Sequence, residues 1–190
     1  MKKKILWFDT ETTGTNPEKH DIIQIAMIIE IGDEIVDQQK YSVQPFNWDT
    51  IQPDALKVSG HTIDDLKGFM KPMELYPIIQ KLLCKYVNKF DKQDKFYPAG
   101  YRVDFDLNFL NQFFIKCGDK YFGSFVNWKR LDPLPMMHLL DFCDEISLPN
   151  YKLETVCTHF NIPIQAHDAL SDILATRELF YELMGGQIHG

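Results

Sequence analysis

The sequence predicts an α/β domain in which a central mixed β-sheet is flanked by α-helices. Three apolar runs with turn-rich segments between them follow one another near the N-terminus. Apolar residues at helical spacing then dominate the last third of the chain. The length of 190 residues, 45% of them hydrophobic, suffices for one full core and leaves little room for a second. We therefore expect one domain over residues 1–184 and a short C-terminal tail over 185–190.

The first three elements are predicted to form an antiparallel meander, because short turns join them. The three strands are expected over residues 5–10, 22–30 and 34–43. A Pro-, Ser- and Gly-punctuated connection follows them. Apolar residues at spacings of three and four predict helices over residues 75–87, 104–116, 136–143, 153–160 and 169–184, with a short strand over 96–100.

The charge balance limits the kind of partner. The chain has 27 acidic and 20 basic residues, a net charge of −7. This is the wrong sign for a protein that grips long duplexes through many phosphate contacts. It is compatible with an enzyme that engages a short strand end, provided that cations screen an acidic site.

The cysteine pattern and the hydropathy of the chain indicate in which cellular compartment the protein is expected. The four cysteines lie far apart without a C-x-x-C pair, which favours reduced thiols used in packing. No segment approaches the roughly 18 uncharged residues of a membrane span, and the apolar run after Lys4 meets Asp9 too early for a signal peptide. We expect a soluble, cytoplasmic protein without a membrane partner.

The first candidate for chemistry is the pair Asp9 and Glu11 at the end of the first predicted strand. Side chains alternate along a strand, so residues two apart share one face. Two like charges at such a short separation are costly to desolvate unless a cation lies between them. A divalent metal ion suits this position. A solvated pair at a strand end is the alternative.

Three stretches give these acids a context. Trp7 to Gly14 reads WFDTETTG, Phe105 to Leu110 reads FDLNFL, and His167 to Asp172 reads HDALSD. In this order they resemble the three motifs of the DnaQ-like (DEDDh) 3′-to-5′ exonucleases, and the similarity runs from about residue 4 to about residue 180. Taken singly, Asp106 and Asp172 read as ordinary helix acids and His167 as a surface or capping histidine.

The resemblance implies a ribonuclease H-like fold and the removal of nucleotides from the 3′ end of a single strand. It implies two divalent cations, Mg²⁺ or Mn²⁺, which oxygen ligands favour. Their ligands would be Asp9, Glu11, Asp106 and Asp172, with Asp9 shared between both ions. His167 would be the general base, a role that suits an ordinary pKa near 6.5.

The resemblance also implies substrate contacts by Thr10, Thr12 and Thr13 at the terminal sugar. His61 and Arg102 are further substrate candidates, and both depart from the family pattern. Tyr101-Arg102 stands where the family has His-Asn, His61 stands at a usual Ile, and Thr15 replaces a bulky apolar residue. These departures leave the base and sugar preference open.

Two rival functions remain at this stage. One is a 3′-to-5′ exoribonuclease or oligoribonuclease with the same site, since no residue decides whether the 2′-OH is tolerated. The other is a non-catalytic module that binds nucleic-acid ends, which would be expected to lack one of the acids or the histidine. The sequence indicates no polymerase partner, and a homodimer is possible.

Overall fold

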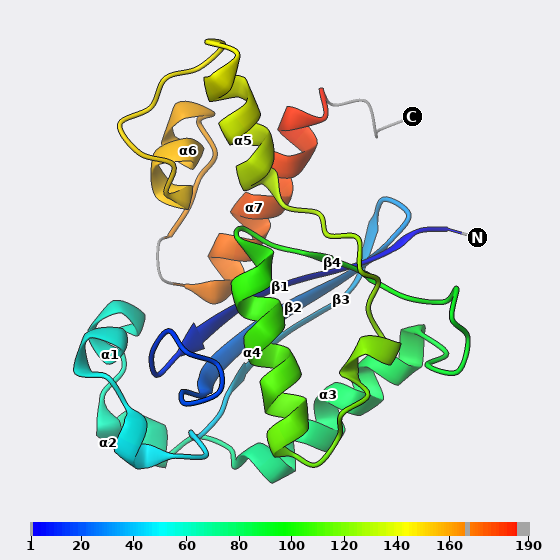
Figure 1. The fold of residues 1–190 in the computed structure, drawn as a ribbon, viewed down its shortest axis with the longest axis vertical. Helices are drawn as coiled ribbons and strands as arrows, with labels where there is room; N and C mark the ends of the chain where they lie inside the picture. Colours follow the sequence, from blue (N-terminus) through cyan, green and yellow to red (C-terminus); the bar gives the residue numbers. More distant parts are fainter. Residues whose placement is uncertain (1, 166–167, 186–190) are drawn as a thin grey trace.

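The computed structural model describes residues 2–165 and 168–185. Its centre is a four-stranded sheet in the order β3-β2-β1-β4 (Figure 1). The strands are β1 (Lys4–Thr12), β2 (Ile22–Ile31), β3 (Glu34–Ser42) and β4 (Tyr97–Ala99). β1 and β3 each pair antiparallel with β2, whereas β4 pairs parallel with β1. The predicted meander and the mixed sheet are confirmed.

Helices follow and flank the strands. They are α1 (Pro53–Ser59), α2 (Ile63–Lys67), α3 (Pro72–Tyr86), α4 (Val103–Lys116), α5 (Pro133–Phe142), α6 (Leu153–His159) and α7 (Ala169–Leu183), with short 3₁₀ turns η1 (Trp48–Thr50) and η2 (Phe122–Ser124). The helices predicted at 75–87, 104–116, 136–143, 153–160 and 169–184 correspond to α3 to α7, although α3 and α5 begin three residues earlier, at Pro72 and Pro133.

The segment interpreted as a connection contains α1 and α2, so that interpretation is wrong for residues 53–67. Both helices carry local signals. Pro53 occupies the first turn of α1, and Gly60 ends it in the left-handed region at φ 70°. In α2, Thr62 and Asp65 form a reciprocal capping box.

The alternation of side chains along β1 divides the core between two faces. Leu6 and Phe8 pack with α3 and α4 on one face. Ile5 and Trp7 pack with α7 on the other. Helices therefore cover both faces of β1, which is why its sequence is apolar without interruption from Ile5 to Phe8.

The last helices extend the molecule beyond the sheet. α5 and α6 pack against α7 through Met137, Val156, Cys157 and Leu179, and Figure 1 shows them at one end of the molecule. Cys157 is buried, as a packing role requires, but Cys84 and Cys143 are exposed, so the packing interpretation is wrong for those two. No helix in the described ranges is long and apolar enough to cross a membrane.

Candidate active site

The site begins where β1 runs past the end of β4. The last pair between these strands is Trp7 with Ala99, so Asp9 and Glu11 lie beyond it. They share the face that Ile5 and Trp7 bury against α7. The chain turns from β4 into α4 close to β1, because a Cβ on Gly100 would lie 2.9 Å from the Phe8 carbonyl oxygen. A glycine at this position lets α4 begin beside the acidic end of β1.

Asp106 reaches β1 from the first turn of α4. Its carboxylate is buried, and Oδ1 accepts hydrogen bonds from the backbone N–H of Thr10 at 3.0 Å and from the Thr10 hydroxyl at 2.6 Å. The helix start is held by Asp132, whose carboxylate accepts from the backbone N–H groups of Arg102 and Val103 at 3.2 and 3.1 Å. Thr10 and Asp132 thus fix α4 relative to β1.

Asp172 comes from the first turn of α7, on the other face of the sheet. This helix is capped by Asp168, whose Oδ1 accepts from the backbone N–H groups of Leu170 and Ser171 at 3.1 and 3.0 Å. Asp168 also pairs through Oδ2 with the ammonium of Lys40 at 2.5 Å. β3 therefore holds the start of the helix that carries Asp172.

His167 lies outside the described residues, so its role stays a prediction. The described residues before and after positions 166–167 contact α7 and β3. Upstream, the backbone N–H of Gln165 donates to the Ser171 hydroxyl at 2.8 Å. Downstream, Asp168 makes the contacts given above.

The four acids perturb one another electrostatically. Burial raises the pKa of Asp9 well above its usual value, and the charges of Asp106, Glu11 and Asp172 raise it further. Burial and the charge of Asp172 raise the pKa of Glu11 to about 7, against the opposing effect of Lys40. Burial also raises the pKa of Asp106, although its hydrogen bonds from Thr10 act in the opposite direction. Carboxylates from β1, α4 and α7 therefore lie close enough to interact electrostatically, and this shared electrostatic field joins the three elements.

This donor set fits a hard divalent cation by its chemistry, because buried carboxylate oxygens in mutual repulsion gain from a positive charge between them. Within residues 2–165 and 168–185, no three Asp, Glu, His or Cys side chains are arranged as ready ligands of one ion. Asp106 directs its Oδ1 to Thr10.

The predicted sugar contacts lie at the end of β1, which holds Thr10 and Thr12, and in the loop after it, which begins with Thr13. Thr13 is fully buried, and its hydroxyl accepts from the backbone N–H of Asp21 at 2.9 Å. The Thr12 hydroxyl donates to the Gly14 carbonyl at 2.7 Å. A Cβ on Gly14 would lie 2.5 Å from the His20 ring, so close packing requires glycine there. The contacts that the structure shows for these threonines shape the loop, and their contact with substrate stays a prediction.

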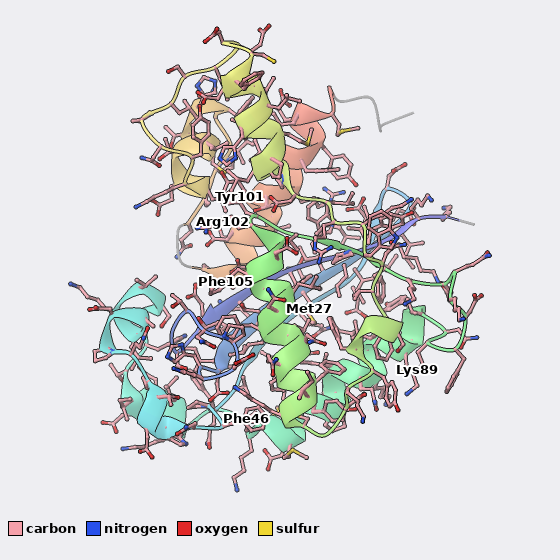
Figure 2. The ribbon with its side chains drawn as sticks, in the orientation of Figure 1. Met27, Phe46, Lys89, Tyr101, Arg102 and Phe105 are labelled. Atoms are coloured by element: carbon pink, nitrogen blue, oxygen red, sulfur yellow. The ribbon has the colours of Figure 1, made fainter. Side chains whose placement is uncertain are left out.

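The remaining predicted residues lie at two sides of the site. His61 follows α1, with its Nε2 3.4 Å from the Gln24 amide nitrogen, and Gln24 pairs with Glu11 across the sheet. Arg102 is exposed and precedes α4 in the left-handed region at φ 58°. Figure 2 shows Arg102 at the N-terminal end of α4.

Sequence reasoning missed Lys40. This lysine pairs with Ala26 on β2, and Ala26 pairs with Asp9 on β1, so all three side chains share one face of the sheet. The register brings a cation beside Glu11 and Asp168. A lysine in the strand Glu34–Ser42 gave no local signal for this position, because the register between strands decides it.

Three comparisons with known proteins show what this chain is similar to. The model of the RNase T exonuclease family matches residues 6–180. Ribonuclease T of Actinobacillus pleuropneumoniae is 30% identical, over 90% of this chain and 79% of that protein. The PolC-type DNA polymerase III of Halalkalibacterium halodurans is 28% identical over 97% of this chain, but the match spans only 12% of the polymerase.

Among solved structures, exonuclease I has the same fold. A product-bound exonuclease I superposes with a TM-score of 0.78 at 19% identity, over 99% of this chain and 45% of that one. Escherichia coli exonuclease I in complex with a dT13 oligonucleotide gives a TM-score of 0.76 at 20% identity, over 98% of this chain and 42% of that one. The chain thus spans less than half of the length of these structures. Because the family model covers nearly the whole chain and its fold is that of exonuclease I, the protein belongs to the DnaQ-like 3′-to-5′ exonuclease family.

Proposed function

We propose that the protein removes nucleotides one at a time from the 3′ end of a single-stranded nucleic acid. The observation that carries this proposal is the shared field of Asp9, Glu11, Asp106 and Asp172, which come from three separate elements of a chain in an exonuclease family. A buried acidic cluster is costly to the fold, and hydrolysis of a phosphodiester is the chemistry that would use it.

The side chains would divide the work as follows. Asp9, Glu11 and Asp172 would hold one divalent cation, and Asp9 with Asp106 the second. When bound, the two ions, Mg²⁺ or Mn²⁺, supply the positive charge that the attacked phosphate and the departing sugar oxygen need. His167 would take the proton of the attacking water, whose oxygen would form the new bond to phosphorus. The bond between phosphorus and the penultimate 3′-oxygen would break, this oxygen would take up a proton to become the new 3′-OH, and a nucleoside 5′-monophosphate would be released.

The terminal nucleotide would lie near the loop after β1. Thr10, Thr12 and Thr13 would present backbone and hydroxyl groups to its sugar, and His61 and Arg102 flank the same region. We place this activity in a domain of residues 1–184, in the cytoplasm, and the sequence indicates no polymerase partner.

DNA is the first candidate substrate, because the PolC-type polymerase is a DNA polymerase and exonuclease I was solved with dT13. RNA is a second candidate for one specific reason. The match to this chain spans 79% of ribonuclease T, which is most of that protein. The match to the polymerase spans only 12% of the polymerase.

Matched 5′-labelled single strands of DNA and RNA test the proposal, with duplexes and a circular single strand as controls. In Mg²⁺ or Mn²⁺ the linear strands should shorten in a ladder from the 3′ end, and EDTA should stop the reaction. A 3′-phosphate should slow it strongly, since the terminal 3′-OH would no longer fit. Cleavage of the circle at the same rate would show an endonuclease instead.

A further inference from the structure

A second feature of the surface lies away from the acidic cluster. A groove of about 760 Å³ runs along α4, between this helix and the segments around Lys92 and Trp128. Four cations line it, Lys92, Lys95, Lys129 and Arg130, and no acidic side chain belongs to its described lining. In a chain with a net charge of −7 this concentration of positive charge is a local exception.

The four cations differ in their hydrogen bonds and ion pairs within the protein. Lys95 donates to the Gly123 carbonyl at 2.5 Å, and Arg130 pairs with Asp104 and donates to the Trp128 carbonyl at 2.6 Å. Lys92 and Lys129 are exposed, and the Lys129 ammonium lies 5.9 Å from the centre of the Trp128 ring. The groove therefore offers positive charge to an external anion.

Trp128 supplies the second half of the chemistry. Its side chain is 78% exposed, so much of the indole is open to solvent, with the Lys129 ammonium near the ring. A positive groove that follows a phosphate backbone, combined with an aromatic ring on which a base can stack, is the arrangement that binds single strands. Stacking needs an unpaired base, so this groove favours a single strand over a duplex.

α4 connects the groove to the candidate active site. Asp106 faces β1, whereas Asn108 and Asn111 of the same helix line the groove. A helix with its side chains is about 10 to 12 Å across. A strand that advances about 3.4 Å per nucleotide would cross it with three or four nucleotides beyond the terminal one. Figure 2 shows Arg102 and Phe105 at the end of α4 that such a strand would cross.

We propose that this groove binds the single strand several nucleotides upstream of the 3′ end that is being removed. Lys92 and Lys129 contact its phosphates, and Trp128 stacks on one of its bases. The inference rests on the proposed function for its direction, from the 3′ end in the site to the 5′ portion in the groove. Substrates of three nucleotides are too short to reach the groove.

Binding tests the groove without cleavage. In EDTA, the fluorescence anisotropy of a 5′-labelled 20-nucleotide single strand is measured at several salt concentrations, with a 3-nucleotide strand for comparison. Trp128→Ala should weaken binding of the 20-mer on the order of 10-fold. The double variant Lys92→Gln, Lys129→Gln should lower the slope of log K against log salt by about 1.4, since each phosphate contact with a single strand contributes about 0.7.

The matched control is Lys71→Gln, Lys81→Gln, which removes two exposed ammonium groups, one just before α3 and one within it, and should leave both values unchanged. In Mn²⁺ the groove variants should raise KM for the 20-mer with kcat unchanged, and should hydrolyse the 3-mer like the wild type. Equal affinity and salt slope in the groove and control variants would overturn the proposal, as would a wild type that binds the 20-mer no better than the 3-mer. A wild type that binds the 20-mer but shortens no strand would count against the proposed activity alone.

Discussion

The carboxylates of Asp9 and Glu11 destabilise the folded chain when no cation is bound. Each is partly buried, and each lies near other acids. Lys40 offsets part of this cost for Glu11. This cost supports the proposed role of the cluster in binding or catalysis, since its charges do not favour the fold.

The pKa of Glu11 makes this cost measurable. Below its ordinary pKa of 4.5, both folded and unfolded chains hold the proton and there is no penalty. Between 4.5 and about 7 only the unfolded chain loses the proton, so stability falls as pH rises, by a total on the order of 3 kcal/mol. In EDTA, Glu11→Gln should therefore have a higher Tm than the wild type at pH 8, and the difference should nearly vanish at pH 4, below the ordinary pKa. A difference independent of pH would show that Glu11 is not the cause.

The role of His167 has a kinetic test. If it takes the proton of the attacking water, His167→Ala should lose on the order of 10² to 10⁴ in kcat. The rise of kcat with pH through the ordinary range of histidine should disappear in the variant. Measuring kcat against pH at saturating Mn²⁺, for both proteins, checks this. An inflection that persists in the variant would remove His167 from the catalytic role.

At the scale of elements, the position of α7 depends on a buried polar network. Glu30 of β2 is fully buried and accepts from the Trp7 indole N–H at 3.0 Å, from Arg177 at 2.7 Å and from the Tyr181 hydroxyl. The network joins β1 and β2 to the helix that carries Asp172. A single carboxylate thus links the sheet to one wall of the candidate site.

Glu30→Ala should destabilise the protein by roughly 3 to 5 kcal/mol, because it leaves the partly buried Arg177 guanidinium without its carboxylate. Urea unfolding in EDTA measures the change. The control is Asp64→Ala, which breaks the exposed pair with Lys67 and should change stability by about 0.5 kcal/mol or less. Similar losses in both variants would contradict the special role of Glu30.

At the scale of the whole molecule, the site depends on parts of the chain that are distant in sequence. Two ions that share Asp9, one also held by Glu11 and Asp172 and the other by Asp106, would join β1, α4 and α7. Binding to the folded chain alone raises its stability. Mn²⁺ should therefore raise the Tm of the wild type more than that of Asp9→Asn, which should also lose turnover. The exposed Asp64→Asn is the control and should respond like the wild type. Equal shifts in Asp9→Asn and the wild type would exclude a metal site at Asp9.

Local patterns predicted much of this arrangement. The alternation in β1 placed Asp9 and Glu11 on one face, and helical spacing placed Asp106 and Asp172 in first helical turns. Further local signals mark the two helices that the sequence prediction lacked. Pro53 and Gly60 mark the ends of α1, and the capping box at Thr62 marks the start of α2. All of these signals lie within a few residues of the feature that they predict.

The sequence by itself determined the fold class, the order of the elements and the acids that belong to one family pattern, because these follow from local periodicity and from motif order. Only the tertiary structure decided that Lys40 lies beside Glu11, that Gly14 is needed for the His20 ring and that four cations and Trp128 share one groove. These contacts join residues by strand register and by packing between elements. Neither strand register nor packing between elements is encoded in the residues adjacent in sequence to these contacts. The local sequence therefore could not predict them.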